Sequence, residues 1–410
     1  MLILRCLLAL SLAGITANPT LAQEQSKGTA VRPEIGKPIQ AAADLVKAKR
    51  GKEALAKVRE AQAIKDKTPF EAYLIDRVLG MAATTAGDAA TAARAFESVA
   101  TSPATPDGER RQFVAAAAGQ YYAAKDYAKA AELSGRYLRD GGTDKSMRTI
   151  HTQALYLGNN FAGAAKALLT DIEAEEQAGR PPAEDQLRLL SDAYLQQHDT
   201  TGYAKALEKL VAFYPKRDYW LAVLHSVAAR PGFSDRLALD VARLKIATGT
   251  MRTTAEYFEA AQLSLHDGFP MEAMKIIEQG YASNLLGVGP EADRHKRLQA
   301  MVDRDLAEDK KTLVQDNTQP AAGKDGKTSF NEGFNYVLHG KNAKGLEMME
   351  QGLRQGGGFK RPDHAKLQLA YAYHLAGQNQ KAIQIYKTAQ GTDGAASLAR
   401  LWIIRLGRAS

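Results

Sequence analysis

The sequence contains very little cysteine, few aromatic residues and no long apolar run. Cys6 is the only cysteine among 410 residues, so an internal disulfide and a disulfide-stabilised scaffold are excluded. Glycine shows no period of three, which excludes a collagen-like chain. No segment reaches 18 uninterrupted apolar residues, so the sequence predicts no transmembrane helix. Hydrophobic residues still make up 45% of the chain, which is enough for a folded core and argues against disorder.

Motifs that carry chemistry are also missing. The sequence has no GxxxxGK[ST] phosphate loop, no GxGxxG turn, no GxSxG elbow and no HExxH pair. The eight histidines are scattered, and the two closest in sequence to each other, His364 and His374, have no nearby pair of carboxylates. We therefore expect no catalytic residue, no metal site and no cofactor, and we predict that the protein is not an enzyme.

The formal net charge of +8 does not come from a single basic patch. Even the densest basic stretch, residues 37–67, carries nine basic and four acidic residues, as the solvated face of a helix would. Nucleic-acid binders usually cluster Lys and Arg with interleaved aromatic residues, and this chain does not. We expect no nucleic-acid partner.

The first 22 residues have the pattern of a secretory signal peptide. Arg5 provides a positive start, ten apolar residues follow at 6–15, and small residues surround a cleavage point near Ala22. The apolar stretch is half the length that a membrane span needs, although an uncleaved anchor is the alternative. Cleavage would remove Cys6, so we expect a mature protein without cysteine and without a transmembrane segment. The expected location is the periplasm or the exterior of the cell.

Alanine is the abundant residue, with 72 copies, and it recurs in a repeated phrase. A turn followed by a small residue and an apolar run begins at Gly87, Lys125, Asn159, Gly202, Gly268, Gly340 and Gly377. Alanine is the strongest helix former, and small residues let two helices approach each other closely. Prolines fall between the apolar-periodic segments, where helices should end. The pattern predicts a chain of helical hairpins.

The repeat resembles the tetratricopeptide repeat, a helix-turn-helix unit of about 34 residues. That unit has small residues at positions 8, 20 and 27, and bulky residues at positions 11 and 24. The copy that begins at Asp363 fits it with Ala370, Tyr373, Ala382, Tyr386 and Ala389. Another copy places Gly80, Ala92 and Phe96 at positions 8, 20 and 24, and a third has Gly333, Gly345 and Gly352 where alanine is usual.

The resemblance implies an all-α fold, an α-solenoid of about nine hairpins with a C-terminal capping helix. After the signal peptide at 1–22, we expect an N-terminal solenoid at 23–288. A linker of one charged helix and a loop is expected at 289–328. A C-terminal pair of hairpins with a cap is expected at 329–410. The sequence leaves open whether the linker helix docks on the solenoid.

Tetratricopeptide proteins often bind partners through the first helix of each hairpin, on the concave surface. Carried onto the repeats of this chain, those positions give a set of candidate partner-binding residues. They are Arg77, Tyr122, Gln153, Tyr156, Phe258, Gln262, Phe330, Phe334, Tyr371 and His374. With Leu367, the phenylalanines and Tyr371 could form an apolar strip that anchors a peptide. Alternatively, the linker or the cap covers them as core.

The C-terminal run from Lys360 to Trp402 resembles the end of exported proteobacterial tetratricopeptide proteins, some of which accompany TonB-type systems. This resemblance implies a periplasmic adaptor that binds protein partners of a cell-envelope complex. The alternative is an accessory protein of envelope polysaccharide assembly or export. An enzyme is the third and least favoured class, because the sequence offers no chemistry for it.

Overall fold

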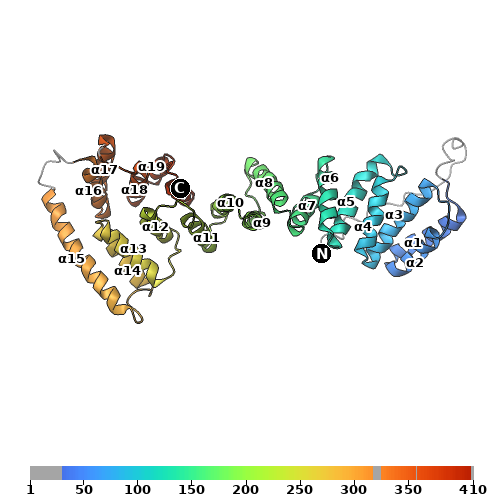
Figure 1. Ribbon diagram of the computed structural model, residues 1–410, viewed down its shortest axis with the longest axis horizontal. Helices are drawn as coiled ribbons and strands as arrows, with labels where there is room; N and C mark the ends of the chain where they lie inside the picture. Colours follow the sequence, from blue (N-terminus) through green and yellow to red (C-terminus); the bar gives the residue numbers. More distant parts are fainter. Residues whose placement is uncertain (1–29, 317–324, 357, 408–410) are drawn as a thin grey trace. The chain divides into compact units, whose positions relative to one another are not determined.

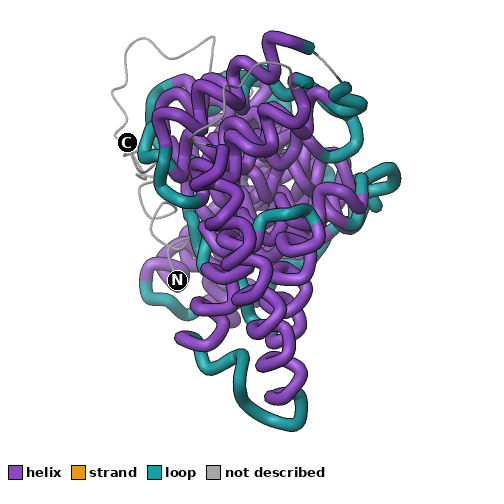
Figure 2. The backbone as a smooth tube through the Cα atoms, turned by 90° about the vertical axis from the view of Figure 1, so that its left-hand side faces the viewer, coloured by secondary structure: helices purple, strands orange, loops and turns teal. Residues whose placement is uncertain are grey.

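The structure is a computed structural model that describes residues 30–316, 325–356 and 358–407. The predicted signal peptide and part of the predicted linker loop lie outside these residues. The described chain is built from α-helices, one short 3-10 helix and loops, and it contains no strand (Figure 2). It divides into two compact units, unit 1 up to Ala178 and unit 2 from Gly179 onward. The domain boundaries expected from the sequence stay predictions.

Unit 1 consists of four helical hairpins, in which each helix packs against the next one along the chain. Its helices are α1 (Pro33–Lys47), α2 (Gly51–Gln62), α3 (Pro69–Ala86), α4 (Ala89–Thr101), α5 (Asp107–Ala123), α6 (Tyr127–Arg139), α7 (Lys145–Leu157) and α8 (Phe161–Gln177) (Figure 1).

Unit 2 continues with five more hairpins, a long single helix and a terminal helix. Its hairpins are α9 (Glu184–Gln196) with α10 (Thr200–Phe213), α11 (Arg217–Ala228) with α12 (Ala238–Ala247), α13 (Thr254–His266) with α14 (Pro270–Ala282), α16 (Gly326–Leu338) with α17 (Asn342–Gln355), and α18 (Pro362–Leu375) with α19 (Asn379–Tyr386). The 3-10 helix η1 (Asp235–Leu237) precedes α12, α15 (Ala292–Asp316) separates the third and fourth pairs, and α20 (Ala395–Gly407) ends the described chain. The expected α-solenoid of about nine hairpins with a capping helix is confirmed.

The repeated turn phrase forms the corner of most hairpins, with a left-handed φ at Gly87, Lys125, Asn159, Gly268, Gly340 and Gly377. In the α9–α10 hairpin the left-handed residue is His198, and Gly202 already lies inside α10. In the second hairpin, Gly87 takes a left-handed φ of 79°, which ends α3, and the side chain of Asp88 then accepts a hydrogen bond from the Thr91 N–H to begin α4. The same device recurs in the third hairpin, where Lys125 has a φ of 62° and Asp126 caps α6. A left-handed residue followed by a capping residue is therefore the local reason that the chain reverses at this spacing.

The small residues of the repeat lie where the two helices of a hairpin cross. A Cβ atom built on Gly333 of α16 would lie 2.6 Å from the backbone oxygen of Gly345 in α17. A Cβ atom on Gly345 would in turn lie 2.4 Å from the backbone oxygen of Gly333. These separations are far below van der Waals contact, so the two backbones touch only because both residues are glycine. The small residues of the repeat therefore mark the place where the two helices approach most closely.

The charged helix of the predicted linker docks within unit 2. Leu298 and Val302 of α15 join the hydrophobic core of α13 and α14, and Val302 is completely buried. Further along α15, Asp309 accepts a hydrogen bond from Asn335 of α16 and lies 2.6 Å from the Nε2 atom of His339. Leu298 and Val302 thus cover the α13–α14 hairpin, and the question of docking that the sequence left open is answered.

Candidate functional site

Arg77 is the first of the predicted binding residues, on the outer surface of α3. Its guanidinium donates to the Tyr73 hydroxyl at 2.7 Å and to the Glu109 carboxylate of α5 at 3.2 Å. It also lies 5.5 Å from the centroid of the Phe113 ring. The side chain keeps 22% of its surface exposed. Arg77 is therefore held in one orientation by two helices while part of it still faces solvent.

Tyr122 and Gln153 continue the same surface onto α5 and α7. The Tyr122 hydroxyl donates to the side-chain oxygen of Gln153 at 2.8 Å, and both residues are partly exposed. Burial raises the pKa of Tyr122, so its hydroxyl stays protonated at neutral pH. One turn further along α7, Tyr156 packs edge-on against Phe161 with ring centroids 5.3 Å apart.

We call the surface formed by Arg77, Met81, Tyr122, Gln153 and Tyr156 on α3, α5 and α7 the A-face. All five side chains are partly exposed. The structure joins Tyr122 directly to Gln153 and places Arg77 and Tyr156 on first helices of the same series of hairpins, and Met81 lies beside Arg77 at the next turn of α3. Tyrosine, arginine and methionine are enriched at protein interfaces, and the contacts between neighbouring helices fix the A-face in place.

In unit 2 the predicted residues are placed differently. Gln262 is exposed on α13, but Phe258 is only 7% exposed. The guanidinium of Arg294 lies 4.2 Å from the centroid of the Phe258 ring, and His295 packs against its side. Because the docked helix α15 covers it, Phe258 belongs to the core, and its assignment to an open binding surface needs correction.

The predicted aromatic strip is also covered. Phe330 and Phe334 are 1% and 0% exposed. Phe334 packs edge-on against Phe269 at 4.8 Å and against Tyr371 at 6.3 Å, while Phe330 packs against Phe359. The alternative that treated these rings as core is therefore correct, and Phe330 and Phe334 do not form an open partner-binding surface. Leu367 is buried with them at 2% exposure.

The terminal helix α20 covers the remaining two candidates, Tyr371 and His374. Trp402 of α20 lies 5.6 Å from the Tyr371 ring and 5.3 Å from the His374 ring, and both residues are only partly exposed. The His374 Nδ1 atom is also 2.9 Å from the side-chain oxygen of Asn379. Helix α20 therefore packs on the two residues that the sequence pattern predicts as partner-binding positions.

A buried ionic cluster lies beside these rings. Arg243 of α12 donates two hydrogen bonds to Glu272 of α14, at 2.8 and 2.7 Å, and one to Asp240 at 3.0 Å. Its guanidinium lies 5.2 Å from the Phe334 centroid and 4.8 Å from that of Tyr371. Burial alone would lower the pKa of Arg243, but the two carboxylates raise it, so the arginine stays charged. Sequence reasoning missed this cluster, because nothing in the repeat pattern pairs these three positions.

The C-terminal hairpins close back onto the earlier helices of unit 2. Arg400 of α20 forms an ion pair with Glu208 of α10 at 3.0 Å, and Arg405 donates to the backbone oxygen of Ala247 at 2.9 Å. The Ser234 N–H donates to the backbone oxygen of Asp393 at 2.8 Å. The terminal helix α20 therefore packs against α10 and α12, which are among the first helices of unit 2.

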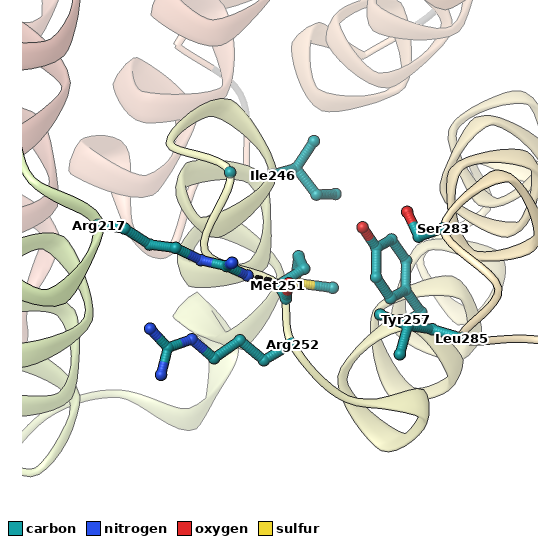
Figure 3. A pocket seen from close by; sticks show the side chains of 8 residues that line it. Arg217, Ile246, Met251, Arg252, Tyr257, Ser283 and Leu285 are labelled. Atoms are coloured by element: carbon teal, nitrogen blue, oxygen red, sulfur yellow. Dashed lines mark hydrogen bonds between the residues drawn. The ribbon is translucent and has the colours of Figure 1, made fainter.

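A pocket of about 560 Å³ opens in unit 2 between the α11–α12 and α13–α14 hairpins. Figure 3 shows the Arg217 and Arg252 side chains on one side and the hydroxyls of Tyr257 and Ser283 on the other. Ile246, Gly249, Met251 and Leu285 complete the lining. The sequence did not point to this pocket, because its residues come from two repeats and occupy no family binding position.

The described residues contain no group of three or more His, Cys, Asp and Glu side chains arranged to hold a metal ion. Within the same ranges, no helix is both long enough and apolar enough to cross a membrane.

No protein-family model and no curated protein matches the sequence. Among solved structures, the TPR2AB domain of yeast Sti1 in its pHSP90 complex is 11% identical, covers 73% of this chain and 99% of its own, and has a TM-score of 0.24. The P58(IPK) TPR domain is 12% identical with a TM-score of 0.22, covering 91% of this chain and 97% of its own. Yeast Tom70 is 11% identical with a TM-score of 0.25, covering 90% and 95% respectively. At these low TM-scores the matches carry no argument about the function of this chain.

Proposed function

We propose that this protein is a non-enzymatic scaffold that binds protein partners through the A-face of unit 1. The observation that carries the proposal is a contrast between the units. In unit 2, Phe258, Phe330 and Phe334 are buried and Trp402 of the cap packs on Tyr371 and His374. Arg77, Tyr122, Gln153 and Tyr156 in unit 1 keep part of their surface exposed.

The composition of the A-face fits a protein ligand. Its two tyrosines and its arginine are the residue types that dominate binding energy in protein interfaces. The hydrogen bond from Tyr122 to Gln153 and the ion pair from Arg77 to Glu109 hold these side chains before any partner arrives. Little side-chain freedom would then be lost on binding, which favours affinity.

We further propose that the chain works in the periplasm and that its partners are proteins of the cell envelope, of the kind that form a TonB-type system. The support is the signal-peptide pattern before residue 23 and the C-terminal resemblance, both read from the sequence. N-terminal sequencing of protein from fractionated cells tests the location. A chain that begins near residue 23 in the periplasmic fraction supports it, and a chain in the cytoplasm that begins at Met1 contradicts it.

An accessory role in envelope polysaccharide assembly or export is the second candidate, and it predicts a glycan as the ligand of the same face. A glycan-binding screen separates the two. Binding of a glycan that Tyr156→Ala abolishes would favour the second candidate over the first.

Site-directed photo-crosslinking in the source cells tests the A-face directly. The crosslinking amino acid replaces Thr149, which is exposed on α7 one turn before Gln153. In a matched control it replaces Lys166, which is exposed on the second helix of the same hairpin. We expect a discrete protein adduct from position 149 and none from position 166.

The crosslinking experiment is repeated with Arg77→Ala and Tyr156→Ala. Because interface tyrosines and arginines often contribute 2 kcal/mol or more, we expect each change to reduce the adduct about tenfold or more. Circular dichroism melting shows whether each variant is still folded. Equal adducts from positions 149 and 166, or adducts that both variants leave unchanged, would contradict the proposal.

A further inference from the structure

The pocket between the α11–α12 and α13–α14 hairpins has features of a small-molecule site that the scaffold function does not use. Its volume of about 560 Å³ lies within the usual range for ligand pockets, roughly 300–1,000 Å³. Its floor is well packed, since Met251 is 5% and Tyr257 7% exposed, while Arg217 and Arg252 are exposed at its side. It lies wholly within unit 2, apart from the A-face.

Positive charge gathers on one side of this pocket. The Arg217 guanidinium donates to the backbone oxygen of Met251 at 3.1 Å, which holds it at the pocket and uses one of its five N–H donors. Arg252 forms an ion pair with Asp218 at 2.8 Å. The Asp218 side chain is 85% exposed and the Arg252 side chain 46%, so this pair is weak and an incoming anion can compete with it.

The remaining lining is apolar with a polar end. The side chains of Ile246, Met251 and Leu285 offer hydrocarbon and thioether surface. The Tyr257 hydroxyl has no hydrogen-bond partner among the described residues, and Figure 3 shows it, with the Ser283 hydroxyl, on the side opposite Arg217. A few polar groups set around apolar surface are typical of sites that fix the orientation of an organic ligand.

We propose that this pocket binds a small organic anion. Its acidic head would pair with the guanidinium groups of Arg217 and Arg252, because arginine forms strong, directional hydrogen bonds with oxyanions. Its apolar body would lie on Met251 and Ile246 and reach toward the Tyr257 hydroxyl. Hydrogen bonds and charge would then hold one end of the ligand, and apolar contact would hold the rest.

Calorimetry on the full chain with three probes tests the proposal. Hexanoate carries both an acidic head and an apolar body, hexanol lacks the charge, and inorganic phosphate lacks the body. We expect saturable binding of hexanoate that is at least tenfold tighter than binding of either other probe. Hexanol binding as tightly as hexanoate would overturn the role of the arginines. Phosphate binding as tightly would reduce the pocket to a surface for simple anions and overturn the proposal of an organic ligand.

Variants place the binding in the pocket. Arg217→Gln should weaken hexanoate about tenfold or more, since a hydrogen bond between charged groups contributes roughly 1.5–3 kcal/mol. Arg297→Gln is the matched control, because Arg297 is exposed on α15 and does not line the pocket.

Methyl NMR gives a second readout that does not depend on a variant being folded. Hexanoate should shift the Met251 methyl resonance, which is assigned by its absence in Met251→Leu. If hexanoate binds but the Met251 methyl resonance does not shift, the ligand does not lie in this pocket. If Arg217→Gln and Arg297→Gln weaken hexanoate binding equally, the binding does not depend on the pocket arginine. Either result would overturn the proposal. So would the absence of hexanoate binding. None of these results bears on partner binding at the A-face.

Discussion

Replacing Gly80 by alanine tests the packing at the crossing of a hairpin. Gly80 lies inside α3, and a Cβ atom there would be 2.5 to 2.9 Å from three atoms of the Phe96 ring in α4. That ring is 1% exposed and packs against Phe113 at 6.2 Å, so it has no room to retreat. To restore ordinary contact, the ring or the helix must move by about 1 Å, and overpacking of this kind costs roughly 1–3 kcal/mol.

The gain in helix propensity works in the opposite direction. Alanine is about 1 kcal/mol better than glycine inside a helix, so we expect Gly80→Ala to destabilise the hairpin by up to about 2 kcal/mol in total. Gly119→Ala is the matched control, because Gly119 lies inside α5 of the same unit and a Cβ atom there would meet nothing within 4 Å. That change should stabilise α5 by about 0.5–1 kcal/mol.

Native-state hydrogen exchange of the full chain measures both effects locally. For Gly80→Ala we expect the slowest amides of α3 and α4 to exchange faster, by up to about thirtyfold. For Gly119→Ala we expect those of α5 to exchange more slowly. If Gly80→Ala slowed exchange as Gly119→Ala does, close contact at the hairpin crossing would not be the reason for glycine at position 80.

Two further predictions concern buried charges. Arg32 donates to the fully buried Glu71 carboxylate and lowers the pKa of Glu71 to about 2. The stability that the ionised Glu71 contributes is therefore present above pH about 4.5 and is lost as the pH falls toward 2. The difference in melting temperature between the wild type and Glu71→Gln should be largest at neutral pH and shrink between pH 4.5 and 2, and a constant difference would refute the linkage. In unit 2, Arg243→Met would leave Glu272 and Asp240 buried without their cation, and it should destabilise the unit by roughly 3–5 kcal/mol. Urea unfolding followed by the fluorescence of Trp220 and Trp402 measures this loss. An unchanged unfolding midpoint would show that the cluster contributes little to stability.

The fold could be predicted in large part because its information is local. Most turn phrases contain the left-handed corner, and some also contain the capping side chain, as Asp88 after Gly87 and Asp126 after Lys125. The reversal of these hairpins is therefore encoded in about ten neighbouring residues. The small residues then mark where the two helices cross, as Gly333 and Gly345 do. A repeat of this kind can be read from one sequence without knowledge of distant contacts.

The exposure of the candidate residues agrees with the sequence pattern in unit 1 and mostly disagrees with it in unit 2, because only the contacts in unit 1 are local. The positions of Tyr122 and Gln153 depend on neighbouring repeats, and the structure brings them together. The covering of Phe334 depends instead on contacts between distant segments, such as those of its ring with Phe269 and with the guanidinium of Arg243. Helical periodicity identifies Phe334 as an apolar residue on the first helix of a hairpin, but it does not tell which later segment packs on that face.

The central claim is that partners bind the A-face of unit 1, and hydrogen exchange of the full chain with a partner identified by crosslinking tests it most directly. The account predicts that the partner protects amides near Arg77, Tyr122 and Tyr156, on α3, α5 and α7, and leaves the second helices α4, α6 and α8 unchanged. Protection confined to unit 2, or to those second helices, would contradict it.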